Sequence, residues 1–296
     1  MPPSPRPDRL GIALVVLSAA TWSLAGVWIE LLPGVPVSSV VAGRLAISLL
    51  LVGPVALWRW RTLGRPTAAV WGLAVLMVAY YGLAVAGFRL TNVAEGTLFL
   101  NVSPLFAVAW ALVRGEQVLP GERWGTALAL AGVAVILLPG LVGGGADGLA
   151  RVMGNAIALA AAGGMAAYSI ALDRLRTAGR APNPLLVTAL TFGLGAAGGL
   201  ALLAVRGDAA TAGLGGAPAW GALVGLGLVT TAIPTFAYSV ASGRLAPILT
   251  TTVRLLTPAF GALAAWLVLD EVPSLWLVPG GALVLGGLLL SVRAKA

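Results

Sequence analysis

The sequence predicts an all-α integral membrane protein, with ten transmembrane helices arranged as two inverted five-helix repeats around a central cavity. The first observation is composition, because 59% of the 296 residues are hydrophobic and only 9% are charged, against about a quarter charged in a soluble domain. The second is that the apolar residues fall in ten runs, each of about the 17–25 residues that a bilayer requires. The third is that features of the first half recur in the second half at a nearly constant spacing.

The ten runs are separated by short breaks that hold most of the charged residues. Glycine and proline occur inside the runs, where membrane-spanning helices tolerate them. The first run follows Arg6 and Arg9 as a signal peptide would, but it is too long for the apolar part of one, and nine further spans follow. The expected spans are residues 10–32, 37–58, 67–88, 93–113, 122–139, 152–172, 184–205, 218–240, 247–269 and 275–292.

The distribution of Lys and Arg over the loops predicts the orientation. Thirteen of the eighteen lie on the side of the N-terminus, three (Arg89, Arg151 and Arg206) lie on the other side, and two lie inside spans. Because cytoplasmic loops carry the excess of positive charge, we expect both termini in the cytoplasm and the chain in the inner (cytoplasmic) membrane as a multi-pass protein. This bias also accounts for the net charge of +8, so no nucleic-acid partner is needed to explain it.

Equivalent residues recur about 155 positions apart, which divides the chain into repeats at residues 1–145 and 146–296. A unit of five spans is odd, so its second copy must enter the membrane the other way up, and a substrate site is expected near the midplane between the halves. The recurring pairs are Arg89 and Arg244, Glu116 and Glu271, Gly125 and Gly280, Gly132 and Gly287, and, one residue closer, Pro104 and Pro258.

The fourth and ninth spans each contain a proline near the middle, at Pro104 and Pro258. Proline removes one backbone hydrogen bond and leaves a carbonyl that another group must satisfy. Interrupted helices at matching places in two halves are a sequence-level indication of a transporter's binding site. We therefore expect these prolines to act as paired hinges.

The two proline segments, PLFAVAWALVRGE and PAFGALAAWLVLDE, and the G-x-A-L-x-L-x-G helix after each resemble the EamA-type transporters of the drug/metabolite transporter superfamily. The resemblance covers nearly the whole chain and both halves. It implies a 5 + 5 inverted-repeat carrier in which spans 1–4 and 6–9 surround the cavity while spans 5 and 10 lie at the periphery. Asp270-Glu271 departs from the Gly-Glu of the pattern, which argues against a transport role for this glutamate.

Polar and aromatic residues deep in the spans are the candidate substrate-binding residues. At about 1.5 Å per residue, Asn101 lies roughly 12 Å from the membrane surface, and Arg254 also lies well inside its span. Each residue also has a structural interpretation: aromatic rings mark interfaces, Asn101 can bond a neighbouring helix, and Arg254 can cap carbonyls, reach the cytoplasm or meet a substrate carboxylate. The candidates are Trp22, Tyr80, Tyr81, Asn101, Tyr168, Tyr238 and Arg254.

Three further charges, Glu30, Arg44 and Glu95, lie toward the outer ends of their spans. A charge inside the membrane costs a few kcal/mol, about 3 at the helix centre, unless it is paired or hydrated. The sequence therefore predicts an ion pair or a small network centred on Arg44, with structural and functional interpretations equally open.

The chain has no cysteine and no histidine, which excludes disulfides, thiolate metal sites and imidazole triads, and we expect no metal and no cofactor. The predicted function is a membrane transporter, an exporter of small metabolites such as neutral or aromatic amino acids by alternating access. A polytopic membrane enzyme and a non-transporting scaffold are the alternatives, and we expect no enzyme because no nucleotide-binding or catalytic motif is present. The cargo, its direction, coupling to protons and the oligomeric state stay open.

Overall fold

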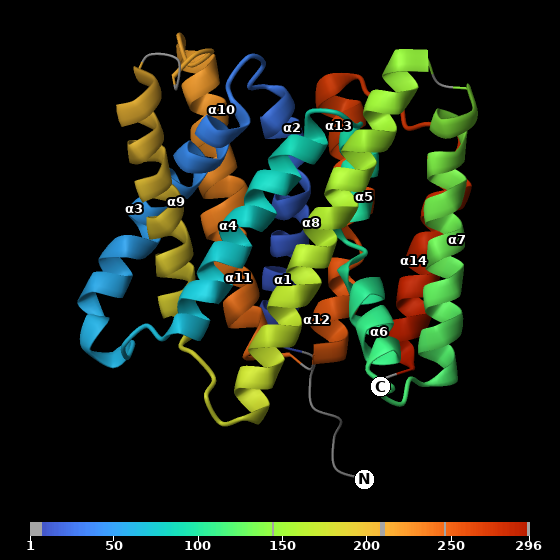
Figure 1. The fold of residues 1–296 in the computed structure, drawn as a ribbon, viewed down its shortest axis with the longest axis horizontal. Coiled ribbons are helices and arrows are strands. Elements are labelled where there is room, and N and C mark those ends of the chain that lie inside the picture. Colours follow the sequence, from blue (N-terminus) through green and yellow to red (C-terminus); the bar gives the residue numbers. More distant parts are fainter. Residues whose placement is uncertain (1–7, 144, 208–210, 246, 295–296) are drawn as a thin grey trace.

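The computed structural model describes residues 8–143, 145–207, 211–245 and 247–294, and these residues form helices and connecting turns without a β-strand. The helices lie side by side as a bundle (Figure 1). Nine helical segments of the described chain have the length and apolar composition to cross a membrane, and a tenth, α14, is apolar and 17 residues long. The predicted all-α membrane fold is confirmed.

Each predicted span coincides with one helix or with two or three consecutive helical pieces. The largest difference in length is α8, which extends beyond the predicted 152–172 at both ends. The first half consists of α1 (Arg9–Ser23), α2 (Ala25–Glu30), α3 (Val37–Trp58), a 3₁₀ turn η1 (Trp60–Thr62), α4 (Ala68–Phe88), α5 (Val93–Leu100), α6 (Ser103–Val113) and α7 (Pro120–Gly143). The second half consists of α8 (Gly145–Thr177), α9 (Pro184–Arg206), α10 (Ala217–Gly227), a π-helical segment η3 (Leu228–Ala232), α11 (Ile233–Ser242), α12 (Pro247–Arg254), α13 (Thr257–Leu269) and α14 (Leu277–Arg293).

The fourth and ninth spans are broken just before their prolines. Pro104 is the second residue of α6 and Pro258 the second residue of α13, where a missing N–H costs little because the first helical N–H groups have no partner in the helix. At each break two successive N–H groups bond three residues back, those of Asn101 and Val102 in one span and of Leu255 and Leu256 in the other. The sequence thus produces the same interruption in both halves.

Helices of the first half pack against their counterparts in the second half. The helix α3 lies against α9, α5 against α13 and α7 against α14, while the packing of α4 on α8 is matched by that of α11 on α1. When each span of the first half is exchanged with the span five places later, every one of these contacts becomes itself or another contact of the set. The set of contacts therefore supports the proposed two-fold relation between the halves.

Paired glycines bring α7 and α14 together at one edge of the bundle (Figure 1). A Cβ on Gly287 would meet the carbonyl oxygen of Gly125, and a Cβ on Gly132 would meet the carbonyl oxygen of Gly280. Glycine permits this close approach, which is how apolar helices gain packing energy where lipid is as apolar as their side chains. The repeat relation exchanges these two contacts, because Gly132 and Gly280 are the counterparts of Gly287 and Gly125, as a two-fold axis between the helices requires.

The start of α1 and the end of α14 lie at the same end of the bundle (Figure 1), called here the N-terminal side. The other end is called the opposite side.

Candidate functional site

A cavity of about 600 Å³ lies between the two halves. Its described lining residues come from spans 1–4 and 6–9, and the described parts of α7 and α14 contribute none. On the N-terminal side the lining reaches the exposed residues Arg176, Ser242 and Gly243, so the cavity meets solvent there. Toward the opposite side it ends at Phe88, which belongs to a buried apolar cluster with Ile29. The cavity is therefore accessible from one side and closed by apolar packing on the other.

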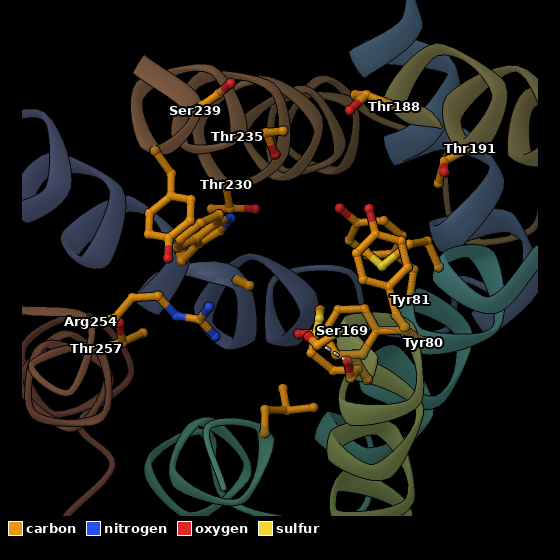
Figure 2. Close-up of a pocket in the computed structure, with 18 of the residues that line it drawn as sticks. Tyr80, Tyr81, Ser169, Thr188, Thr191, Thr230, Thr235, Ser239, Arg254 and Thr257 are labelled. Carbon is orange, nitrogen blue, oxygen red and sulfur yellow. Dashed lines mark hydrogen bonds between the residues drawn. The ribbon is translucent and has the colours of Figure 1, made fainter. Parts of the chain in front are cut away.

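All seven candidate substrate-binding residues line this cavity, although they are spread over six spans. They are Trp22 on α1, Tyr80 and Tyr81 on α4, Asn101 at the end of α5, Tyr168 on α8, Tyr238 on α11 and Arg254 at the end of α12. Figure 2 shows Arg254 reaching into the cavity from one wall while Tyr80 and Tyr81 lie on the other side of the space. Their placement makes binding of a substrate feasible, and the binding role itself stays a prediction.

One wall combines two aromatic rings with a cation. The rings of Trp22 and Tyr238 are tilted to each other with centroids 5.3 Å apart. The guanidinium carbon of Arg254 lies 5.6 Å from the Trp22 ring centroid and 5.8 Å from that of Tyr238, within the range of a cation–π interaction. The ring contacts hold Arg254 toward the cavity, and the described residues supply no ion-pair or hydrogen-bond partner for it.

The other wall repeats this combination with different residues. The rings of Tyr80 and Tyr81 meet edge to face with centroids 5.5 Å apart. The guanidinium carbon of Arg44 lies 4.7 Å from the centroid of Tyr81. The Nε and Nη2 of Arg44 both donate to the hydroxyl of Thr231, at 3.1 and 2.8 Å. That hydroxyl donates in turn to the carbonyl of Leu226, so the arginine is held by neutral groups.

In the part of the chain that the structure describes, Asn101 bonds its own helix and not a neighbouring one. Its amide nitrogen donates to the carbonyl of Thr97 on the same helix at 2.8 Å, at the end of α5 where carbonyls lose their helical partners. The side chain also lines the cavity. One N–H of the amide is used within α5, which leaves its second N–H as a donor and its oxygen as an acceptor.

The predicted network of Glu30, Arg44 and Glu95 does not form. Arg44 contacts Thr231 and Tyr81 as described above, whereas Glu95 is fully buried and pairs with the Nε of Arg151 at 3.3 Å. Asn155 and Ser274 also donate to the carboxylate of Glu95, at 2.7 and 3.2 Å. Glu30 is exposed at the end of α2. The prediction failed because these residues face different neighbours, which the order of residues along the chain does not reveal.

Sequence reasoning also undervalued Glu271 and missed the π-helical segment. The N–H groups of Val93 and Ala94 donate to the two carboxylate oxygens of Glu271 at 3.0 and 3.3 Å, so this residue caps α5 across the interface between the halves. In η3, the Thr230 and Thr231 hydroxyls both bond the carbonyl of Leu226. The run Thr-Thr-Ala-Ile-Pro could have indicated that segment, because Pro234 lacks the N–H that continues a regular helix.

Residues 9–138 and 152–293 each match the EamA-like transporter family. An uncharacterized transporter from Archaeoglobus fulgidus is 28% identical over 96% of this chain and 97% of its own length. A probable terminal-alkyne amino-acid exporter from Streptantibioticus cattleyicolor is 30% identical over 94% of this chain and 92% of its own. One solved crystal structure aligns with a TM-score of 0.63 and 22% identity over 96% of this chain and 97% of its own, a likeness of fold. Since the family match extends over both halves, this chain belongs to the EamA-like transporter family.

Proposed function

We propose that this transporter exports small metabolites such as neutral or aromatic amino acids across the cytoplasmic membrane by alternating access. The observation that carries the proposal is the cavity, which lies between the two halves and meets solvent on one side only. Its volume of about 600 Å³ is within the range of pockets that bind small molecules. Aromatic rings on both walls offer apolar surface with polar edges, which suits a cargo that has an apolar body and a small polar head.

The relatives support this cargo class. The relative from Streptantibioticus cattleyicolor is named for amino-acid export, and it aligns with nearly all of this chain. We assign the N-terminal side to the cytoplasm because most Lys and Arg lie there. Reporter fusions after Leu32 and after Leu63 should then report opposite sides of the membrane. Fusions that report the same side would overturn the topology.

Alternating access is supported by a difference between two equivalent contacts. On the opposite side, Glu271 binds the first N–H groups of α5. Its counterpart Glu116 would, by the same relation, bind the first N–H groups of α12. Instead the side chain of Glu116 is 58% exposed and lies 3.9 Å from the Nε of Arg114. Among the described residues, the carboxylate contact is thus made on the closed side and not on the side where the cavity is open.

The equivalent arginines both make contacts, but with different partners. Arg89 donates from Nη2 to the carbonyls of Leu32 and Val35, which ties the end of α4 to the connection between α2 and α3 on the closed side. Its counterpart Arg244 forms an ion pair with Asp8 ahead of α1 at 2.8 Å. The backbone N–H of Gly11 and the guanidinium of Arg244 lower the pKa of that aspartate. We infer that closure of the N-terminal side moves Glu116 onto α12 while Glu271 leaves α5.

A labelling experiment tests this exchange, and the absence of cysteine in the sequence allows single-cysteine variants. Ala25→Cys reports access to the closed end of the cavity, and Ser242→Cys reports access to the open end. We expect Glu271→Gln to increase labelling of Ala25→Cys from the opposite side, because it weakens the cap on α5. Glu116→Gln is the matched control and should leave that labelling unchanged or lower it. Equal labelling in both variants would contradict the exchange.

Transport itself is tested with the purified full chain in liposomes. Labelled phenylalanine, leucine and related metabolites should cross the membrane at rates that saturate with concentration, and the excess of one cargo should inhibit another. A correctly folded preparation that moves none of them would overturn the proposed function.

A further inference from the structure

The charges around the cavity are all of one sign. The described lining residues include three arginines, Arg44, Arg176 and Arg254, and no aspartate or glutamate. Arg176 is exposed at the mouth, while Arg44 is 3% exposed within the wall. Arg44 has a neutral threonine and an aromatic ring as its partners, and Arg254 has two aromatic rings. The cavity therefore carries a positive charge that the described lining does not neutralise.

The geometry around Arg254 favours an anionic ligand. In a cation–π contact the guanidinium lies near an aromatic ring, and its N–H donors remain free to bind oxygen atoms. Beside it, the hydroxyl of Thr257 is buried and has no hydrogen-bond partner in the described structure. Figure 2 shows Thr257 next to Arg254 at the edge of the cavity. Thr257 also begins α13, the 13-residue helix whose N-terminus follows the break and carries partial positive charge.

We propose that the cargo enters this cavity as an organic anion with net negative charge, bound through a carboxylate by Arg254 and Thr257 while its apolar body packs against Trp22 and Tyr238. This rests on the proposed transport function and changes its substrate class from neutral amino acids to organic anions. A bidentate contact between guanidinium and carboxylate is the strongest pairing that Arg254 can make. It also removes the cost of an unpaired cation inside the membrane.

The described lining offers no group that would bind an amino group of the cargo as strongly as Arg254 would bind its carboxylate. An ammonium group would share the cavity with three arginines, and the described lining has no carboxylate to balance it. Neutral acceptors are present instead, in the hydroxyls of Thr235 and Ser239 that face the cavity (Figure 2). These groups suit an acylated amine or a cargo without nitrogen better than a free ammonium group.

The test uses four labelled compounds that share a phenyl ring and differ in charge. They are N-acetylphenylalanine and 3-phenylpropanoate as anions, phenylalanine as a zwitterion and phenethylamine as a cation. Saturable uptake of each is measured at pH 7 in liposomes that contain the full chain, with empty liposomes subtracted. We expect both anions to have lower half-saturating concentrations than phenylalanine, and phenethylamine to show no saturable uptake.

Three variants connect this preference to the proposed residues. Arg254→Gln should raise the half-saturating concentration of N-acetylphenylalanine ten- to a hundredfold, about the loss of one hydrogen bond to a charged group, and should abolish the preference over phenylalanine. Arg254→Lys should restore part of it. Thr257→Val should have a smaller effect of the same sign. Arg174→Gln is the matched control, because Arg174 contacts the ring of Trp110 and does not line the cavity.

Each outcome decides between the two proposals. If phenylalanine is transported as well as the anions, or if Arg254→Gln keeps the charge preference, the anionic class is wrong while the transport function stands. If none of the four compounds crosses through a folded preparation, the proposed function fails for this cargo class and the anionic inference fails with it.

Discussion

At the scale of single residues, the surroundings of each buried charge indicate its role. Glu95 is fully buried and satisfied by Arg151, Asn155 and Ser274, as expected of a structural carboxylate. Arg254 has only ring contacts in the described structure and faces the cavity. Burial alone would rank Glu95 above Arg254 as a functional residue. Their hydrogen-bond and ion-pair partners reverse that ranking, because a charge that is already paired within the protein is not available to bind a ligand.

Asn101 provides the first prediction at this scale. One N–H of its amide donates to the Thr97 carbonyl, so substitution by alanine removes the remaining donor and the acceptor from the cavity wall and a cap from the end of α5. We expect Asn101→Ala to raise the half-saturating concentration of cargo about tenfold, equivalent to roughly 1.4 kcal/mol. The measurement is the concentration dependence of initial uptake. An unchanged half-saturating concentration with a lower maximal rate would assign the residue to the helix break instead of the cargo.

Trp22 provides the second prediction. Its ring packs on Tyr238 and supports Arg254, so Trp22→Ala removes apolar surface and frees the guanidinium. We expect a larger loss of transport for phenyl-bearing cargo than for an alanine-sized cargo, because only the larger body reaches the missing ring. Parallel uptake measurements of the two cargoes test this. An equal loss for both would indicate that the ring acts only by holding Arg254.

At the scale of elements, some helix interruptions were predictable and others were not. Proline acts on its own turn of backbone, so the breaks before Pro104 and Pro258 follow from sequence alone. The first span is also interrupted, at Leu24 between α1 and α2, where the chain has no proline and its nearest glycine, Gly26, lies inside α2. Its position depends on packing against other spans. The ring of Trp22 and the end of α5 line the same cavity because helices distant in sequence pack together. A local sequence pattern does not predict that packing.

The two prolines yield a prediction about movement. Pro104→Ala and Pro258→Ala restore an N–H group and should allow each pair of helices to join into a straighter helix. We expect near-normal expression and slower transport in each variant, because the break is where the helix would bend as access alternates. Pro54→Ala is the matched control, since Pro54 lies inside α3, is exposed and does not line the cavity. Normal transport in both single variants and in the double variant would rule out the hinge role.

The glycine contact between α7 and α14 yields a prediction about stability. A Cβ on Gly287 would meet the carbonyl of Gly125 and lie 2.7 Å from the amide nitrogen of Ala129, so the helices must move apart. The adjacent Gly286 has only a leucine methyl group nearby, at 3.9 Å. We expect Gly287→Ala to lower the unfolding temperature in detergent while Gly286→Ala leaves it within the error of the measurement. Equal unfolding temperatures would mean that α7 and α14 can move apart without a loss of stability.

At the scale of the whole molecule, composition and periodicity were sufficient to predict the class of fold, because bilayer thickness dictates the length of every span. The paired contacts between α7 and α14, and the carboxylate cap of Glu271 on α5, could not be predicted in advance. They join residues that lie in different halves of the chain. The spacing of repeated residues indicated which positions correspond, but it did not indicate which of two equivalent contacts is formed. That choice belongs to the conformational state of the protein.

The charge around the cavity leads to a final prediction, about the driving force. The sequence has no histidine, and the described lining residues include no aspartate or glutamate. The described lining therefore offers no imidazole or carboxylate to carry a proton with the cargo, so we expect the net charge of an anionic cargo to cross uncompensated. We expect a membrane potential set by a potassium gradient and valinomycin to accelerate transport of N-acetylphenylalanine toward the positive side. A pH gradient at zero potential should leave the rate unchanged, and accumulation driven by the pH gradient alone would show that a proton accompanies the cargo.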